Sequence, residues 1–176
     1  NDEHLIIAHI FNKHARFNLL VDFKSKGVFL EDVDILIHNC TSVTMDAEQP
    51  IIERGFIAVK NGKIAHIGKK NSAFSDLKAR KTINATGKVV LPGLVNCHTH
   101  ASMTLFRGIA EDRQLDEWLK NVIWPLEAKL KPKDVYDGAL LGCLEMIKSG
   151  TTCFADMYFH EEAVAKAVEK AGLRAV

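Results

Sequence analysis

The chain has 176 residues, of which 47% are hydrophobic and 26% are charged, and its formal net charge at pH 7 is +1. This is the composition of a globular protein, without the excess of positive charge typical of proteins that bind nucleic acid or an anionic membrane surface. Its apolar runs fall well short of the ~18 residues of a membrane span, and the acidic N-terminus does not resemble a secretory signal. We therefore expect a cytoplasmic protein without a nucleic-acid or membrane partner.

The cysteines are few and irregularly spaced, and no Cys-x-x-Cys pair is present. This spacing favours reduced, buried thiols over a disulfide framework or a zinc ribbon. The four residues are Cys40, Cys97, Cys143 and Cys153.

Short strands are predicted from Val33 onward. The apolar residues Val33, Ile35 and Ile37 recur with the period of two of a half-buried strand, and Asp34 and His38 are the polar residues set against them. Residues 55–60 and 63–68 flank Asn61-Gly62, the strongest signal for a two-residue hairpin with a type I′ turn. The remaining elements are a short helical patch at 72–80 and strands at 81–85 and 88–91. We expect residues 33–91 to form a small antiparallel β module.

The pattern changes after Pro92-Gly93. Residues 94–98 form an apolar run too short for a helix and bounded by turn residues, which predicts a strand buried on both faces of a parallel sheet. The elements expected next are a helix over 115–130 that Pro125 kinks or divides, a helix from Pro132 to Gly150, a strand over 151–157, a helix over 161–171 capped by Gly172, and a third strand from 173. This order predicts right-handed parallel crossovers, in a doubly wound sheet or a β/α barrel.

His98 and His100 stand where the first of these parallel strands ends. Residues i and i+2 of a strand project to the same side, so both imidazoles can reach one metal ion. Active sites of parallel α/β folds lie at the carboxyl ends of strands. The pair is therefore a candidate metal site, and a hydrogen-bonded pair packed under the following loop is the alternative.

The motifs around this pair resemble a known family. The run from Val90 to His100 reads Val-Leu-Pro-Gly-Leu-Val-Asn-Cys-His-Thr-His and resembles the first-strand signature of the amidohydrolase superfamily. The 5′-methylthioadenosine/S-adenosylhomocysteine deaminases, with the related archaeal 5′-deoxyadenosine deaminases, resemble the chain further at Met103–Gly108, Trp118-Leu119, Ile123–Glu127, Ser149–Thr152 and Asp156-Met157. The resemblance covers about residues 33–176 and leaves 1–32 as an extension of unknown role.

The resemblance implies an α/β fold. Residues 33–91 would be part of a small β-sandwich, and residues 92–176 the first two β/α units and the start of the third strand of a TIM-type (β/α)8 barrel. His98 and His100 would bind one divalent metal ion, with Zn²⁺ the expected ion, and Glu127 would contact the substrate ribose. Read without the resemblance, Glu127 is an exposed glutamate on a helix surface.

The resemblance also implies a reaction, hydrolytic deamination of S-adenosylhomocysteine, 5′-methylthioadenosine, 5′-deoxyadenosine or adenosine. Water activated by the metal attacks C6 of the purine and ammonia leaves. The partners are thus a purine nucleoside and water, with a homo-oligomer open for the full-length protein. The family's two later metal ligands and its proton-transfer residues have no counterpart up to Val176, so we expect this chain to be an inactive N-terminal part of the enzyme.

Two alternatives remain open. One is another amidohydrolase, such as a triazine chlorohydrolase or another heterocycle aminohydrolase, and the other is a truncated, non-catalytic metal-binding module. Glu127 separates the enzymes, because a ribose-binding carboxylate has no purpose on a substrate without ribose. Of the nearby polar residues, we expect Asp156 to be a hydrogen-bond partner near the barrel mouth and His160 to lie at the N-terminus of the next helix.

Overall fold

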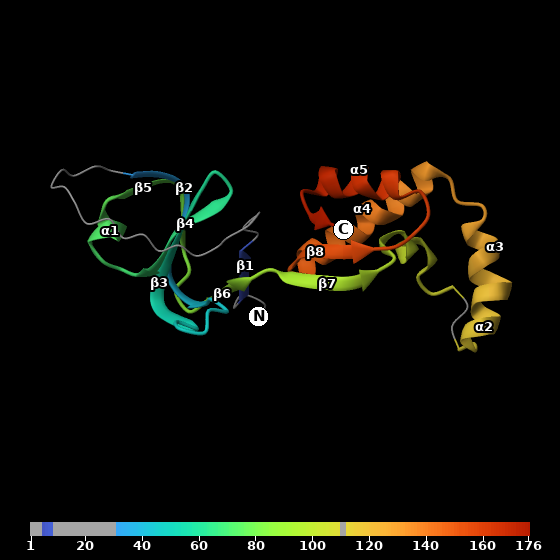
Figure 1. Ribbon diagram of the computed structural model, residues 1–176, viewed down its shortest axis with the longest axis horizontal. Helices are drawn as coiled ribbons and strands as arrows, with labels where there is room; N and C mark the ends of the chain where they lie inside the picture. The colour runs from blue at the N-terminus through green and yellow to red at the C-terminus, as the bar shows by residue number, and fades with distance from the viewer. Residues whose placement is uncertain (1–4, 9–30, 110–111) are drawn as a thin grey trace. The chain divides into compact units, whose positions relative to one another are not determined.

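The computed structural model describes residues 5–8, 31–109 and 112–176 (Figure 1). The chain divides after Gly93 into two compact units, residues 1–93 and 94–176. None of the helices in the described residues has the length and apolar content of a membrane-spanning segment.

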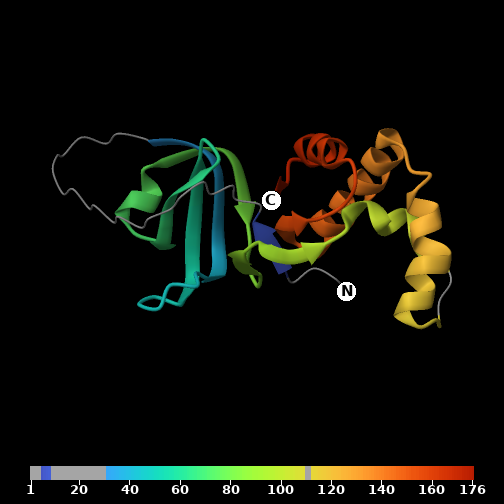
Figure 2. The same ribbon diagram turned by 45° about the vertical axis from the view of Figure 1, so that its right-hand side comes forward.

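The first unit is built on a six-stranded sheet with the order β1-β6-β2-β3-β4, in which β5 also pairs with β2 (Figure 2). Its elements are β1 (Leu5–Ala8), β2 (Glu31–Val43), β3 (Ile51–Lys60), β4 (Lys63–Lys69), α1 (Ser72–Ser75), β5 (Leu77–Asn84) and β6 (Val89–Pro92). Strand β1 belongs to the extension over residues 1–32, and it runs parallel to β6. Part of that extension is therefore built into the sheet.

The expectation of an antiparallel module is wrong, because the sheet is mixed. Strand β3 is antiparallel to β2 and β4, whereas β5 and β6 are parallel to β2. After β4 the chain does not return by a hairpin. It crosses through α1 to reach β2, and a crossover connection gives a parallel pair.

In this unit the prediction from local turn chemistry is confirmed, whereas the prediction for a segment that pairs with a distant strand is wrong. The hairpin at Asn61-Gly62 is confirmed, with φ angles of 52° and 69° that match a type I′ turn. The helical patch predicted up to residue 80 is wrong, because α1 ends at Ser75 and β5 begins at Leu77. Residues 77–84 pair along β2 instead, and this ladder overrides their local preference.

Both faces of β2 are covered, so the strict alternation expected of a half-buried strand does not hold. Leu36 packs in a cluster with Phe56, whereas its neighbour Ile37 packs in a second cluster with Ile57. All four side chains are buried.

The second unit contains the parallel sheet β7-β8-β9. Its elements are β7 (Leu94–Thr99), the 3₁₀ segment η1 (Ala101–Phe106), α2 (Leu115–Trp118), the π-helical turn η2 (Leu119–Ile123), α3 (Trp124–Glu127), α4 (Pro132–Ser149), β8 (Thr151–Asp156), α5 (Glu161–Ala171) and β9 (Arg174–Ala175). Helices α4 and α5 lie on the same side of the sheet in Figures 1 and 2. Both end at glycines in the left-handed region, Gly150 (φ 88°) and Gly172 (φ 76°), which confirms the predicted β-α-β-α-β order and its helix ends. The described residues do not close a barrel.

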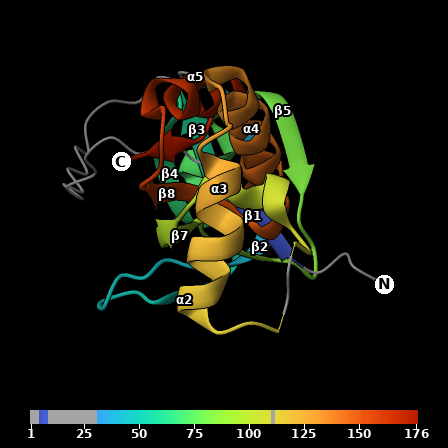
Figure 3. The same ribbon diagram turned by 90° about the vertical axis from the view of Figure 1, so that its right-hand side faces the viewer.

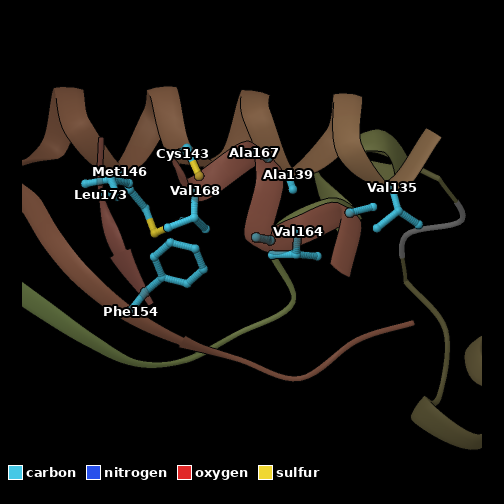
Figure 4. Close-up of a cluster of buried hydrophobic side chains, with 11 residues drawn as sticks. Val135, Ala139, Cys143, Met146, Phe154, Val164, Ala167, Val168 and Leu173 are labelled. Carbon is cyan, nitrogen blue, oxygen red and sulfur yellow. The ribbon is translucent and has the colours of Figure 1, made fainter. Parts of the chain in front are cut away.

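The core of this unit lies between the sheet and the two helices. Figure 4 shows the Phe154 side chain of β8 directed toward Met146 and Cys143 of α4 and Val168 of α5. Phe154 is 1% exposed, so its burial contributes about 2 to 3 kcal/mol by the usual transfer scale. This cluster packs helices α4 and α5 against β8, and β8 pairs in turn with β7 and β9.

Burial on both faces of β7, expected from its sequence, is wrong in this structure. Leu94 and Val95 are 51% and 62% exposed within the described residues, because the buried cluster of this unit gathers on β8 and the two helices. Cys97 of the same strand is exposed, and Cys153 is half-buried, so only two of the four thiols are buried as expected.

The helix predicted over 115–130 forms as one rod from α2 through η2 to α3 (Figure 3). The expected break at Pro125 takes the form of a π turn. Proline has no N–H for the carbonyl four residues before it, and the Trp124 N–H bonds the carbonyl of Leu119, five residues back. A one-residue widening of this kind absorbs the proline without ending the helix.

Candidate functional site

Two imidazoles meet at the carboxyl end of β7. The rings of His98 and His100 have centroids 5.0 Å apart and an interplanar angle of 76°. His98 is exposed and His100 is half-buried. The expectation that residues i and i+2 of this strand bring both rings together is confirmed.

A hydrogen bond to the backbone orients the His100 ring. Its Nδ1 lies 2.6 Å from the carbonyl oxygen of Met157. A carbonyl only accepts hydrogen bonds, so Nδ1 is the donor and Nε2 is the nitrogen left to bind a metal. Histidines that bind metals typically donate their second ring N–H to a carbonyl or a carboxylate in this way.

Strand β8 ends directly beside the histidine pair. Asp156 lies opposite Thr99 in the parallel register, and its Oδ1 accepts a hydrogen bond of 2.9 Å from the Ala101 N–H. The prediction of Asp156 as a hydrogen-bond partner near this end of the sheet is confirmed. Its Oδ2 is buried without a hydrogen-bond partner in the described residues. His160 follows as the residue that precedes α5, also as predicted.

The segment that follows the histidines, η1, is packed closely on α4. The Ser102 hydroxyl, which is fully buried, donates to the Val135 carbonyl at 2.9 Å, and Thr104 donates to the Gly138 carbonyl at 2.7 Å. A Cβ atom on Gly142 would lie 2.7 Å from the Ala101 carbonyl oxygen. The backbones therefore approach more closely than any side chain at this position of α4 allows.

Tyr158 connects Glu127 to the histidine pair. The Tyr158 ring lies 6.1 Å from the ring of His100. Its hydroxyl is buried and makes no hydrogen bond of good geometry within the described residues. Burial, followed by the neighbouring carboxylate of Glu127, raises the pKa of Tyr158 far above its usual value. Glu127 is itself half-buried, in contrast to an exposed glutamate on a helix surface.

Sequence reasoning had not singled out Tyr158 for this site. The signal that could have found it is its position, because it follows the carboxyl end of β8 as the histidines follow β7.

The two histidines suit zinc, because neutral imidazoles are among its common ligands and His100 has a free Nε2. Within residues 31–109 and 112–176, no three His, Cys, Asp or Glu side chains gather closely enough to hold a metal ion. Catalytic zinc generally has three protein ligands. The pair therefore accounts for two positions of such a site.

Comparison with known proteins now defines the family. The sequence matches the amidohydrolase family over residues 89–176, half of the chain. The chain belongs to this family. It is 54% identical over 142 residues to a 5′-deoxyadenosine deaminase of Methanosarcina barkeri and 49% identical over 142 residues to a 5-methylthioadenosine/S-adenosylhomocysteine deaminase of Desulforamulus reducens. Each alignment covers 81% of this chain and 32% or 33% of the relative.

Two solved structures that contain zinc are similar to this chain in fold. A zinc-bound adenosine deaminase of Xanthomonas campestris has a TM-score of 0.78 and 36% identity, over 83% of this chain and 34% of its own. A zinc complex of atrazine chlorohydrolase from Arthrobacter aurescens has a TM-score of 0.70 and 27% identity, over 80% of this chain and 34% of its own.

The resemblance inferred from the motifs is confirmed by these relatives, which are named as deaminases of adenosine-type nucleosides. The chain spans about a third of the length of the relatives that it matches.

Proposed function

We propose that this chain forms part of a metal-dependent enzyme that hydrolytically deaminates adenosine-type nucleosides. The observation that carries the proposal is the pair of imidazoles, His98 and His100, at the carboxyl end of β7, with the His100 ring oriented by its hydrogen bond to the Met157 carbonyl. The 49% and 54% identity to two named nucleoside deaminases supports it. The second unit would be the first part of a (β/α)8 barrel preceded by part of a β-sandwich, with residues 1–32 as an extension.

In this proposal each residue has a separate task. His98 and His100 would hold a divalent ion, for which zinc is the candidate because both zinc-containing neighbours belong to the same family. When bound, the metal supplies a water acidic enough to act as a nucleophile at neutral pH. Glu127 would accept hydrogen bonds from ribose hydroxyls, for which an ionised carboxylate is a strong double acceptor.

A chimaera tests the proposal in the context of a complete enzyme. The 142 matched residues would replace their counterparts in the deaminase of M. barkeri, and conversion of adenosine or 5′-deoxyadenosine to the inosine form would be followed by ultraviolet absorbance. We expect zinc-dependent turnover that His98→Ala or His100→Ala abolishes. A folded, zinc-loaded chimaera that leaves nucleosides unchanged contradicts the proposal.

Glu127 provides the test of substrate class. Glu127→Gln should raise KM for nucleosides more than it lowers kcat, because it weakens a contact made in both the ground state and the transition state. The matched control is Glu117→Gln in the same rod, where the exposed carboxylate pairs with Arg113 at 3.2 Å. An unchanged KM removes Glu127 from ribose binding, and turnover of triazines but not of nucleosides would favour the alternative amidohydrolase.

A further inference from the structure

The carboxyl end of β8 contacts both the ring of His100 and the backbone that follows it. The Met157 carbonyl accepts from His100 Nδ1 at 2.6 Å, and Asp156 Oδ1 accepts from the Ala101 N–H at 2.9 Å. The His100 side chain is therefore bonded to Met157, which directly follows β8, and the backbone of the next residue is bonded to Asp156, the last residue of β8.

This end of β8 is itself held on both sides. The Met157 N–H donates to the Thr99 carbonyl of β7 at 3.3 Å, and the Asp156 N–H donates to the Val176 carbonyl at 3.0 Å. Any displacement of Asp156 must therefore disturb the pairing with both neighbouring segments. The carboxylate that accepts from the Ala101 N–H is therefore anchored by the backbone hydrogen bonds on both sides of β8.

Burying the Asp156 carboxylate costs more desolvation free energy than its single hydrogen bond to the Ala101 N–H requires. Asp156 Oδ2 is buried without a hydrogen-bond partner in the described residues, and such groups are rare in native structures because desolvation is not compensated. A position that needed only filling would be served at lower cost by an apolar side chain of similar size. The Asp156 carboxylate instead accepts from the Ala101 N–H, the backbone amide directly after His100.

We infer that Asp156 is a positioning residue for the metal site: its carboxylate, together with the Met157 carbonyl, fixes His100 with Nε2 directed at the metal. This inference rests on the metal site of the proposed function and adds a residue outside the ligand set. Residues that orient metal ligands typically change metal affinity about 10- to 100-fold when they are replaced.

The experiment measures zinc binding to the chimaera with the M. barkeri deaminase, which supplies the rest of the enzyme, by competition with a chromophoric chelator. Asp156→Leu keeps the approximate volume and removes the acceptor, and we expect zinc affinity to fall at least about tenfold. Asp156→Asn keeps an acceptor oxygen for the Ala101 N–H and should stay within about threefold of the unaltered chimaera. Asp137→Asn is the matched control, because this aspartate lies on the surface of α4, 51% exposed and paired with Lys133, and it should bind zinc normally.

Equal zinc affinity of a folded Asp156→Leu variant and the unaltered chimaera overturns the inference and leaves the proposed function standing. Failure of the unaltered chimaera to bind zinc through His98 and His100 overturns both. If Asp156→Leu does not fold, nitrogen NMR of the unaltered chimaera decides: a His100 ring protonated at Nδ1 and a slowly exchanging Ala101 amide support the clamp. A ring protonated at Nε2, or a rapidly exchanging Ala101 amide, refutes it.

Discussion

Gly142 provides a sharp test of how the fold places the candidate metal site. Its Cβ position lies 2.7 Å from the Ala101 carbonyl oxygen, whereas ordinary contacts begin at 3.4 Å. In Gly142→Ala the two backbones must therefore separate by about 0.7 Å. The obstacle is backbone rather than a flexible side chain, so η1 itself has to move, and with it the residue next to His100.

Two opposed free-energy terms set the size of the effect. Alanine favours a helix over glycine by about 1 kcal/mol, and overpacking a buried contact costs about 1 to 3 kcal/mol. We expect the unfolding free energy of the second unit to fall by about 1 kcal/mol as the balance of these two terms. Zinc affinity should fall with it, because the displaced carbonyl belongs to the residue after His100.

Tryptophan fluorescence during urea unfolding reports on the second unit alone, because both tryptophans, Trp118 and Trp124, lie in it. The control is Gly68→Ala in the first unit, where an added Cβ meets nothing within 4 Å. This control should leave the fluorescence transition unchanged. A Gly142→Ala chain that unfolds at a higher urea concentration than the unaltered chain would refute the reasoning, because helix propensity would then exceed the packing penalty.

Two further predictions concern ionisable groups. Hydrogen bonding from His66 and Lys60 lowers the pKa of Glu31, so its contribution is present above the ordinary glutamate pKa and is lost as pH falls through the lower folded value. Glu31→Gln should thus reduce the unfolding free energy at pH 7 by about 0.5 kcal/mol, a small value because the pair is partly exposed. Circular dichroism in urea should show this difference shrink as the pH falls below the ordinary glutamate pKa. A difference that stays constant across that range contradicts the prediction. Burial, and then the charge of Asp156, raises the pKa of Cys143 to about 11. Iodoacetamide at pH 7.5 should therefore alkylate the exposed Cys97 well before Cys143. Peptide mapping measures the two rates, and equal labelling of both cysteines contradicts this prediction.

The functional site was predictable as far as motifs and strand periodicity reach. His98 and His100 follow from spacing and from their position at the end of a strand, and Glu127 follows from a family motif. Tyr158 and Asp156 were harder to assign, because a tyrosine after a strand and an aspartate within one have many roles. Their tasks depend on which atoms of distant segments lie opposite them, such as the Ala101 N–H, 55 residues away from Asp156.

The sequence by itself determined the order of elements in the second unit, the helix ends at Gly150 and Gly172, and the hairpin at Asn61-Gly62, because periodicity, caps and turns depend on neighbouring residues. The tertiary structure alone decided that β5 lies parallel to β2. It also decided that glycine at 142 is a requirement of packing rather than a defect of the helix. Strand partners and close backbone approaches depend on distances between residues far apart in the chain, and local conformational preferences do not encode those distances.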